Sequence, residues 1–420
     1  MILLSVVLIL LAILGAPLFA IIATSAMLGF HRGGDDLMIM ANEIQSIADL
    51  PFLSAIPLFT FAGYVLSESD APKRLVHVTG ALIGWMPGGL ALVSLEACAF
   101  FTAFTGASGV TIIALGAILY PALKHDGYPD KFNLGLVTSS GSLGLLFAPS
   151  LPLILYGVIA EVSIDNLFLA GILPGLVMLA MLSAWSLWVN RSNRKPLATF
   201  SWKAAASALR ESIWELPLPF VVLGGIYSGY LAVSEAAAVT ALYVLIVEVV
   251  INREVSLREL PRIMRSSMVL VGGILLILGV SLASTNYMIG AGIPQMLLGY
   301  VAALVSSPVS FLILLLVFLL ILGAILDIFS AIVLVVPLIL PIAAQYGVNE
   351  VHLGIVFLAA MQLGYMTPPV GLNLFIASYR FEKPIMHVYS ATFPFLVILT
   401  LSVILIAFWP GLSLWLVPNP

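Results

Sequence analysis

Long stretches of this sequence carry almost no charge, and this feature limits the possible folds more than any other. Residues 80–120, for example, contain a single charged side chain, Glu96. Only 9% of the 420 residues are charged and 62% are hydrophobic, whereas soluble domains are about half apolar and roughly a quarter charged. A soluble domain cannot bury such an excess, because much of its surface stays in water. The sequence therefore predicts an all-α protein that crosses a membrane several times, and it excludes a soluble enzyme, a nucleic-acid binder and a disordered chain.

Several apolar runs are long enough to cross a bilayer. A helix needs about 20 apolar residues to cross a hydrocarbon core of about 30 Å. Full-length candidates are 2–29, 132–160, 166–189, 267–290, 352–378 and 386–409, and shorter ones are 52–68, 216–231 and 236–251. The first run has no basic residue before it and exceeds the roughly 7–15 residues of a signal-peptide core, so we expect a retained membrane helix.

Two other apolar stretches are interrupted near their middle. Residues 88–121 are interrupted at 105–109, and residues 309–341 are interrupted at 323–330. Each stretch then has two arms of about 12–16 residues, or about 18–24 Å of helix, which is too short to cross comfortably. We therefore predict two re-entrant helical hairpins.

The distribution of Lys and Arg predicts the topology, because these residues mark the cytoplasmic side. Nine of the sixteen lie between Arg191 and Arg265, and the segments 71–84 and 122–131 carry others. The loops 161–165 and 342–351 have no basic residue and are expected outside. All of these assignments fit one topology, with the N-terminus inside the cell and the C-terminus outside. Residues 201–215 are expected to form an interfacial helix, while 71–84 can be a similar helix or an ordinary loop.

The chain contains an internal repeat. A shift of 220 residues places Pro121 on Pro341, Gly127 on Gly347, Gly144 on Gly364, Pro149 on Pro369 and Pro174 on Pro394. Basic residues precede the broken span of the first unit (Lys124, Lys131) but follow that of the second (Arg380, Lys383). This difference predicts opposite orientations in the membrane, and inverted repeats are typical of secondary transporters.

Proline-containing segments interrupt one span in each unit, at 147–152 and 366–371. Proline removes a backbone donor and clashes with the preceding turn, so several carbonyls lose their helical partners. Unwound backbone at membrane depth is tolerated only where it is buried in protein or lines a cavity. A desolvated cation can use these carbonyls, and half-helix N-termini can hold an anionic group. A purely structural kink is the alternative, but two breaks at matching positions, each beside a hairpin, favour the binding site.

Uncharged oxygen-bearing side chains surround both breaks, and such ligands suit sodium better than a divalent ion. Each of them can also serve helix packing in lipid. They are Thr105, Ser108, Thr138, Ser139, Ser140, Ser142, Thr367 and Asn373.

Three acidic residues lie in apolar surroundings. Asp327, at the second hairpin tip, can have a functional role or cap the following helix. For Glu96 an interhelical bond is favoured over a proton or cation role. Glu235 is expected to cap the span that starts at 236.

Motifs of catalysis are missing from the sequence. It has no phosphate-binding loop, no metalloprotease motif and no catalytic triad signature, and Cys98 is its only cysteine. The five histidines are scattered over loops and span ends, where we expect them to be solvated or interfacial. An intramembrane enzyme therefore ranks far behind a transporter.

Five segments carry a resemblance to a known family. They are Thr105-Gly-Ala-Ser-Gly-Val, Leu146-Phe-Ala-Pro-Ser-Leu-Pro-Leu-Ile-Leu-Tyr-Gly, Ser234-Glu-Ala-Ala-Ala-Val, Leu326-Asp and Thr367-Pro-Pro-Val-Gly-Leu-Asn-Leu-Phe. Over essentially its whole length the chain resembles the large membrane subunit of tripartite ATP-independent periplasmic (TRAP) transporters of the dicarboxylate type. The resemblance implies sodium-driven import of small carboxylates across the bacterial inner membrane by an elevator mechanism, with sodium as coupling ion and no other cofactor. It also implies two partners, a small four-helix membrane subunit and a periplasmic substrate-binding protein.

The resemblance also implies a domain division and site residues. Its parts are N-terminal scaffold helices with an interfacial arm (1–87), a first transport repeat (88–175), scaffold helices with a cytoplasmic arm (176–266), linking helices (267–308), a second transport repeat (309–395) and the end of the last helix with a tail (396–420). By motif position one sodium ion falls on Thr105, Ser108, Gly144, Phe147 and Pro149, and another falls on Gly323, Gly364, Thr367 and Val370. The candidate substrate contacts are Ser140, Ser150, Asp327 and Asn373. A self-sufficient transporter of a related fold, working without a binding protein, is the alternative.

Overall fold

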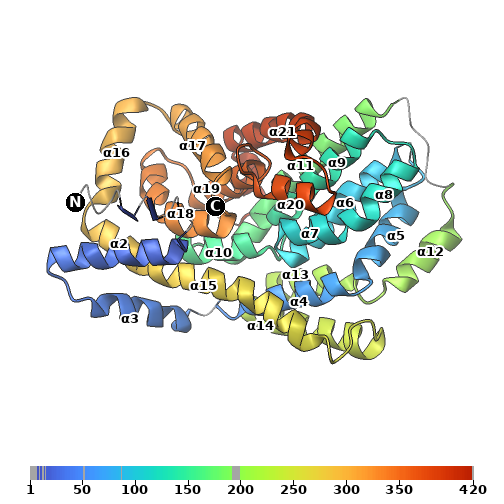
Figure 1. Ribbon diagram of the computed structural model, residues 1–420, viewed down its shortest axis with the longest axis horizontal. Coiled ribbons are helices and arrows are strands. Elements are labelled where there is room, and N and C mark those ends of the chain that lie inside the picture. Colours follow the sequence, from blue (N-terminus) through green and yellow to red (C-terminus); the bar gives the residue numbers. More distant parts are fainter. Residues whose placement is uncertain are drawn as a thin grey trace.

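The computed structural model describes residues 7–8, 10–11, 14, 16–50, 53–86, 88–191 and 199–418, and every regular element in these ranges is a helix (Figure 1). Five described helices are long and apolar enough to cross a membrane alone, or up to eight spans result if each bent pair counts as one. Helices satisfy their own backbone polar groups, which hydrocarbon cannot do. The predicted all-helical membrane fold is therefore confirmed.

The N-terminal apolar run is not one helix over 2–29. Helix α2 (Leu18–Gly33) begins after Ala16 and Pro17, which are not helical. Proline cannot donate a helical hydrogen bond, and it disfavours helical backbone at the residue before it. The prediction of a single span is thus wrong, and residues 1–6 lie outside the described ranges.

A layer of helices from both halves of the chain runs along the lower part of Figure 1. Its helix α4 packs between α14 and α15, and α2 and α3 pack along α15. The helix pair expected at 216–231 and 236–251 is confirmed as α13 and α14. Besides α2, the layer comprises α3 (Met38–Ser46), η1 (Ile47–Asp49), α4 (Ala55–Glu68), α13 (Pro217–Tyr227), α14 (Val233–Leu245) with its π-helical extension η3 (Ile246–Ile251), and α15 (Leu260–Gly290).

The first repeat consists of an arm, a hairpin, a broken span and a long helix. The hairpin's second arm bends by 49° and the broken span bends by 43°. The elements are α5 (Ala71–Ile83), α6 (Gly89–Thr105), α7 (Ser108–Ala114), α8 (Gly116–His125), α9 (Asp130–Ser140), η2 (Leu143–Leu146), α10 (Leu151–Ala160) and α11 (Ile164–Val189), followed by α12 (Trp202–Glu211).

The second repeat has the same order of elements. They are α16 (Ile293–Leu304), α17 (Pro308–Gly323), α18 (Ile328–Gln345), α19 (Glu350–Gly364), α20 (Leu372–Arg380) and α21 (Ile385–Phe408), followed by α22 (Gly411–Leu414). Helix α18 has 18 residues and is long and apolar enough to be a span by itself, so the expectation that both arms are too short is wrong for it. Helix α18 contains Pro337 and Pro341, and neither proline ends it.

The structure extends the repeat beyond the segment indicated by the sequence. The 220-residue shift carries the limits of α7 and α8 onto those of α18, and it carries the cis peptide bond Ala148–Pro149 onto Pro368–Pro369. It also carries α4 into α15 and α5 onto α16. Both pairs lie before Pro121 and Pro341, where the repeat predicted from the sequence begins.

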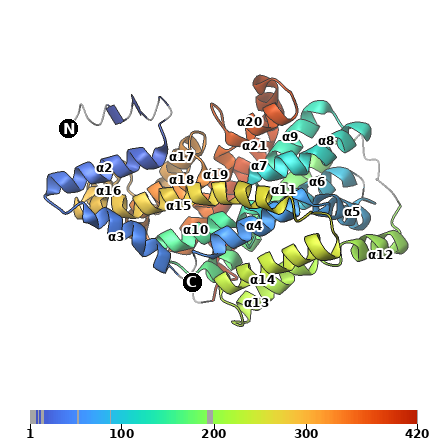
Figure 2. The same ribbon diagram turned by 60° about the horizontal axis from the view of Figure 1, so that its bottom comes forward.

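The two hairpins start at opposite ends of the molecule. In Figures 1 and 2, α5 and the turn into α6 lie towards the right, whereas α16 and the turn into α17 lie towards the left. The units are therefore inverted with respect to each other, as the loop charges predicted.

Two polar side chains differ from expectation. His352 is buried, with Nδ1 2.9 Å from Ser413 Oγ and Nε2 3.2 Å from the Ala407 carbonyl, because α22 packs against α19. Glu96 is half-buried and makes no side-chain hydrogen bond with the described residues, so the expected interhelical bond is wrong. Its neighbours one helical turn away, Leu92 and Phe100, offer no donor.

Candidate functional site

The first helix break leaves main-chain oxygens without partners. Residues 147–150 are not helical, and the carbonyls of Phe147, Ala148 and Pro149 accept no hydrogen bond from the described residues. Pro152 explains the free Ala148 carbonyl, because it cannot supply the N–H that would bond four residues back in a continuous helix, and the other two carbonyls are free because residues 147–150 are not helical. Three adjacent carbonyls are thus free to bind a cation.

The tip of the first hairpin lies against this break. A Cβ at Gly144 would be 2.2 Å from the Ala99 carbonyl oxygen, so only glycine lets η2 approach α6 this closely. A Cβ at Gly106 would be 2.7 Å from the Leu151 side chain at the start of α10. Thr105, the residue before Gly106, is buried, and its Oγ1 has no hydrogen-bond partner. Thr105 and Gly144, two of the predicted residues of the first site, therefore lie where the first hairpin meets the break.

The second break encloses the tip of the second hairpin in the same way. A Cβ at Gly364 would be 2.5 Å from the Gly323 Cα, and the Gly371 N–H donates to the Ala324 carbonyl at 3.1 Å. The Thr367 hydroxyl donates to the Leu363 carbonyl at 3.0 Å, which leaves its lone pairs available. Carbonyls that accept no hydrogen bond from the described residues are those of Met366, Thr367, Pro368 and Val370.

The two breaks share one core. Ser108 Oγ, at the first hairpin tip, donates to Asn373 Oδ1 in α20 at 2.7 Å. In addition, α7 packs against α20, and α10 packs against α18. The second half of each broken span thus contacts the hairpin of the other repeat, so the two sites are mechanically connected.

Five buried polar atoms near the breaks have no hydrogen-bond partner in the described structure. A buried polar atom without a partner costs about 1–3 kcal/mol, so each of these atoms is available to a ligand or to water. Gln362 was missed by the sequence reasoning, although the 220-residue shift places it on Ser142, which was considered. The atoms are Thr105 Oγ1, Ser139 Oγ, Ser150 Oγ, Gln362 Oε1 and Asn373 Nδ2.

Asp327 caps helix α18. Its Oδ1 accepts the N–H groups of Phe329 and Ser330, both at 3.0 Å, and its Oδ2 accepts the Ser330 hydroxyl at 2.5 Å. The Ile328 N–H donates to the Tyr365 hydroxyl at 2.7 Å, which also braces this tip. Both oxygens of Asp327 are therefore engaged inside the hairpin.

Two other sequence candidates have different environments. Ser140 Oγ donates weakly to the Val137 carbonyl at 3.3 Å and is fully buried. Glu235 accepts the Ala232 N–H at 2.9 Å at the start of α14, so the predicted helix cap is confirmed.

Comparison with known proteins agrees with this architecture. The family model described as "Tripartite ATP-independent periplasmic transporter, DctM component" matches residues 2–412. A C4-dicarboxylate TRAP transporter large permease protein, DctM, from Pseudomonas aeruginosa is 32% identical over 389 residues, which cover 92% of this chain and 90% of the relative. The ectoine/5-hydroxyectoine TRAP transporter large permease protein UehC from Ruegeria pomeroyi is 30% identical over 412 residues, covering 97% and 96%.

A solved structure shares the fold alone. The YdaH transporter of Alcanivorax borkumensis matches with a TM-score of 0.64 at 12% identity, covering 90% of this chain and 88% of that one. The chain belongs to the DctM family, the large permease subunits of tripartite ATP-independent periplasmic transporters.

Proposed function

We propose that this chain imports small carboxylates, such as C4-dicarboxylates, across the bacterial inner membrane in symport with sodium. One observation carries the proposal: each inverted repeat holds unpaired main-chain carbonyls against a hairpin tip. A small membrane subunit and a periplasmic substrate-binding protein would complete the transporter. In this proposal the N-terminus is cytoplasmic and the C-terminus is periplasmic.

Sodium fits the oxygens of the two breaks. A monovalent hard cation can be held by neutral carbonyl and hydroxyl oxygens, as at the unwound helices of other transporters. The unpartnered Thr105 Oγ1 supports this assignment at the first site, and the available Thr367 hydroxyl supports it at the second. The proposed ligands are Thr105, Ser108, Gly144, Phe147 and Pro149 for one ion, and Gly323, Gly364, Thr367 and Val370 for the other.

A carboxylate fits the polar groups between these sites. Ser150 Oγ and Asn373 Nδ2 are buried donors without partners, and the first turns of α10 and α20 have no side-chain cap. Uncapped helix N-termini attract anions. Ser140 and Asp327 complete the proposed substrate contacts. Asp327 would act by holding the tip of the second hairpin, because it caps α18. The relatives named for C4-dicarboxylates and for ectoine support small organic substrates.

An elevator motion is part of the proposal. The helix layer containing α4 would stay fixed while the two hairpins and broken spans move with the bound substrate. Gly63 of α4 supports this division, because a Cβ there would be 2.7 Å from the Thr105 Cα. Because glycine has no side chain, Gly63 does not obstruct a sliding movement of the first hairpin tip along α4.

Reconstitution tests the proposal. The chain, its small membrane subunit and its binding protein should move a C4-dicarboxylate into liposomes only under an inward sodium gradient. Unchanged uptake without sodium that instead requires a proton gradient would overturn the coupling. Robust sodium-driven uptake by the chain alone would favour the self-sufficient transporter.

A further inference from the structure

Seven carboxylates at the end of the molecule that carries α5 and α12 are engaged by neighbouring groups. The largest cluster surrounds Arg74 of α5, which is 13% exposed. Arg74 Nη2 lies 2.5 Å from Glu215 Oε1 and 3.4 Å from Glu248 Oε1, while Nη1 contacts Glu254. Three carboxylates thus contact the single, largely enclosed guanidinium of Arg74 rather than the exposed cations of this end.

Four more carboxylates at this end are engaged by other groups. Glu68 pairs with Arg262 at 2.7 Å, Asp70 with Lys73 at 2.5 Å and Glu211 with His77 at 2.8 Å. Glu259 accepts the N–H of Ser256 at 2.9 Å and its hydroxyl at 2.7 Å.

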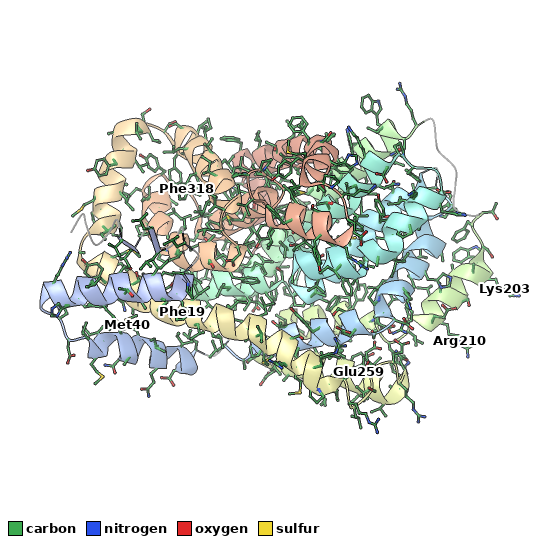
Figure 3. All side chains as sticks on the ribbon, viewed as in Figure 1. Phe19, Met40, Lys203, Arg210, Glu259 and Phe318 are labelled. Atoms are coloured by element: carbon green, nitrogen blue, oxygen red, sulfur yellow. The ribbon has the colours of Figure 1, made fainter. Side chains whose placement is uncertain are left out.

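Six cations at the same end have no carboxylate partner among the described residues. All six are exposed, and Figure 3 shows Lys203 and Arg210 projecting from α12 away from the helix bundle. None of these six cations pairs with a carboxylate of the described residues, so they leave exposed positive charge at this end of the molecule. They are Arg191, Lys203, Arg210, Arg253, Arg258 and Arg265.

Aromatic side chains accompany these cations. Phe200 lies between Trp85 and Trp202, with ring centroids 6.2 Å and 5.0 Å away, and Trp202 is 80% exposed. The Arg191 guanidinium lies 5.8 Å from the centroid of the Trp188 ring. Exposed tryptophan beside Lys and Arg is typical of a protein surface at the headgroup level of a bilayer.

We propose that this surface, formed by Trp85, Phe200, Trp202, Lys203 and Arg210 and here called the arm surface, binds anionic phospholipid headgroups. Lys203 and Arg210 contact the phosphates, and Trp202 enters the interface beside them. Lipid is favoured over a protein partner because exposed aromatic rings lie beside the exposed cations, and clusters of basic residues on an amphipathic helix are typical of anionic-lipid sites. The inference does not depend on the transported substrate or on sodium.

Fluorescence quenching tests the inference. The full-length chain is reconstituted into phosphatidylcholine vesicles containing either brominated phosphatidylglycerol or the same fraction of brominated phosphatidylcholine. The Trp202 signal is the difference between the wild type and Trp202→Phe. We expect stronger quenching by the brominated anionic lipid, and we expect added salt to weaken this preference.

A charge reversal isolates the cations. Each basic residue at an anionic surface is worth about fivefold in binding, so Lys203→Glu with Arg210→Glu should lower the preference for phosphatidylglycerol by about thirtyfold or more. Arg32→Glu with Arg380→Glu makes the same change in net charge at residues outside the arm surface and should leave the preference unchanged.

Three results would overturn the proposal. They are equal quenching by both lipids, an unchanged preference in the double reversal at Lys203 and Arg210, and loss of lipid quenching when the small membrane subunit is added. The last result would assign the arm surface to a protein interface. All three can be distinguished from a failure of sodium-driven transport, because no substrate is present.

Discussion

At the scale of single residues, two threonines one turn apart in α6 have different roles. The Thr102 hydroxyl is 2.7 Å from Thr111 Oγ1 and donates to the Gly141 carbonyl at 2.9 Å. The Thr105 hydroxyl is equally buried and has no partner. Thr102 therefore stabilises the hairpin, while Thr105 is left for a ligand.

Thr105→Val should weaken the apparent sodium affinity of transport by about tenfold, because one ion–oxygen contact worth roughly 1.5 kcal/mol is lost. The thermal stability of the Thr105→Val variant should not fall, since no hydrogen bond within the protein is removed. Sodium titration of uptake and thermal unfolding measure the two quantities.

Thr102→Val is the matched control. It should cost about 1 kcal/mol of stability or more, because its partners are left buried, and it should change the sodium affinity little. If both variants lost the same stability and neither changed the sodium dependence, Thr105 would not be a ligand.

At the scale of elements, the second site depends on two glycines in contact. Gly323 ends α17 and Gly364 ends α19, and their backbones touch. Any side chain at either position would push the hairpin away from the break.

Gly364→Ala should therefore destabilise the protein by about 1–3 kcal/mol and reduce sodium-dependent uptake, because its Cβ would lie 2.5 Å from Gly323 Cα and 2.6 Å from the Gly323 carbonyl carbon. Gly272→Ala in α15 has nothing within 4 Å of the new Cβ and should be neutral or stabilising. Wild-type stability in Gly364→Ala would show that the hairpin can move aside without cost.

The arm α5 depends on Arg74 in a comparable way. Arg74→Met should destabilise the protein by about 3–5 kcal/mol, because it leaves the buried carboxylates of Glu215 and Glu248 uncompensated. Arg262→Met breaks an exposed ion pair with Glu68 and should leave the unfolding temperature near that of the wild type. Equal unfolding temperatures for the two variants would contradict the role assigned to the Arg74 cluster.

At the scale of the whole molecule, the inverted repeats predict labelling from opposite sides of the membrane. Met86 and Ser306 are related by the 220-residue shift and lie in the turns that lead into the two hairpins. Met86→Cys should react with an impermeant maleimide only from the cytoplasmic side, and Ser306→Cys only from the periplasmic side. The native Cys98 is fully buried and provides an unreactive background. Labelling of both positions from the same side would refute the inverted topology.

Much of the fold could be read from local signals in the sequence. The breaks at 147–152 and 366–371 were predictable because proline acts on its own turn and on the residue before it. The same rule at Pro17 was overlooked, and for that reason the predicted span over 2–29 was wrong. The burial of His352 and the lack of a hydrogen-bond partner for Glu96 could not be predicted, because both depend on which helix faces the side chain.

The sequence by itself determined the membrane environment, the helical class, the repeat and the positions of the breaks, because hydropathy, proline and glycine act over a few residues. Only the tertiary structure decided which oxygens remain free. It paired Ser108 with Asn373 and surrounded Arg74 with three carboxylates, although these partners are up to 265 residues apart. Hydrogen bonds and ion pairs act over a few ångströms, so whether a polar group is free or engaged is set by the packing of distant segments.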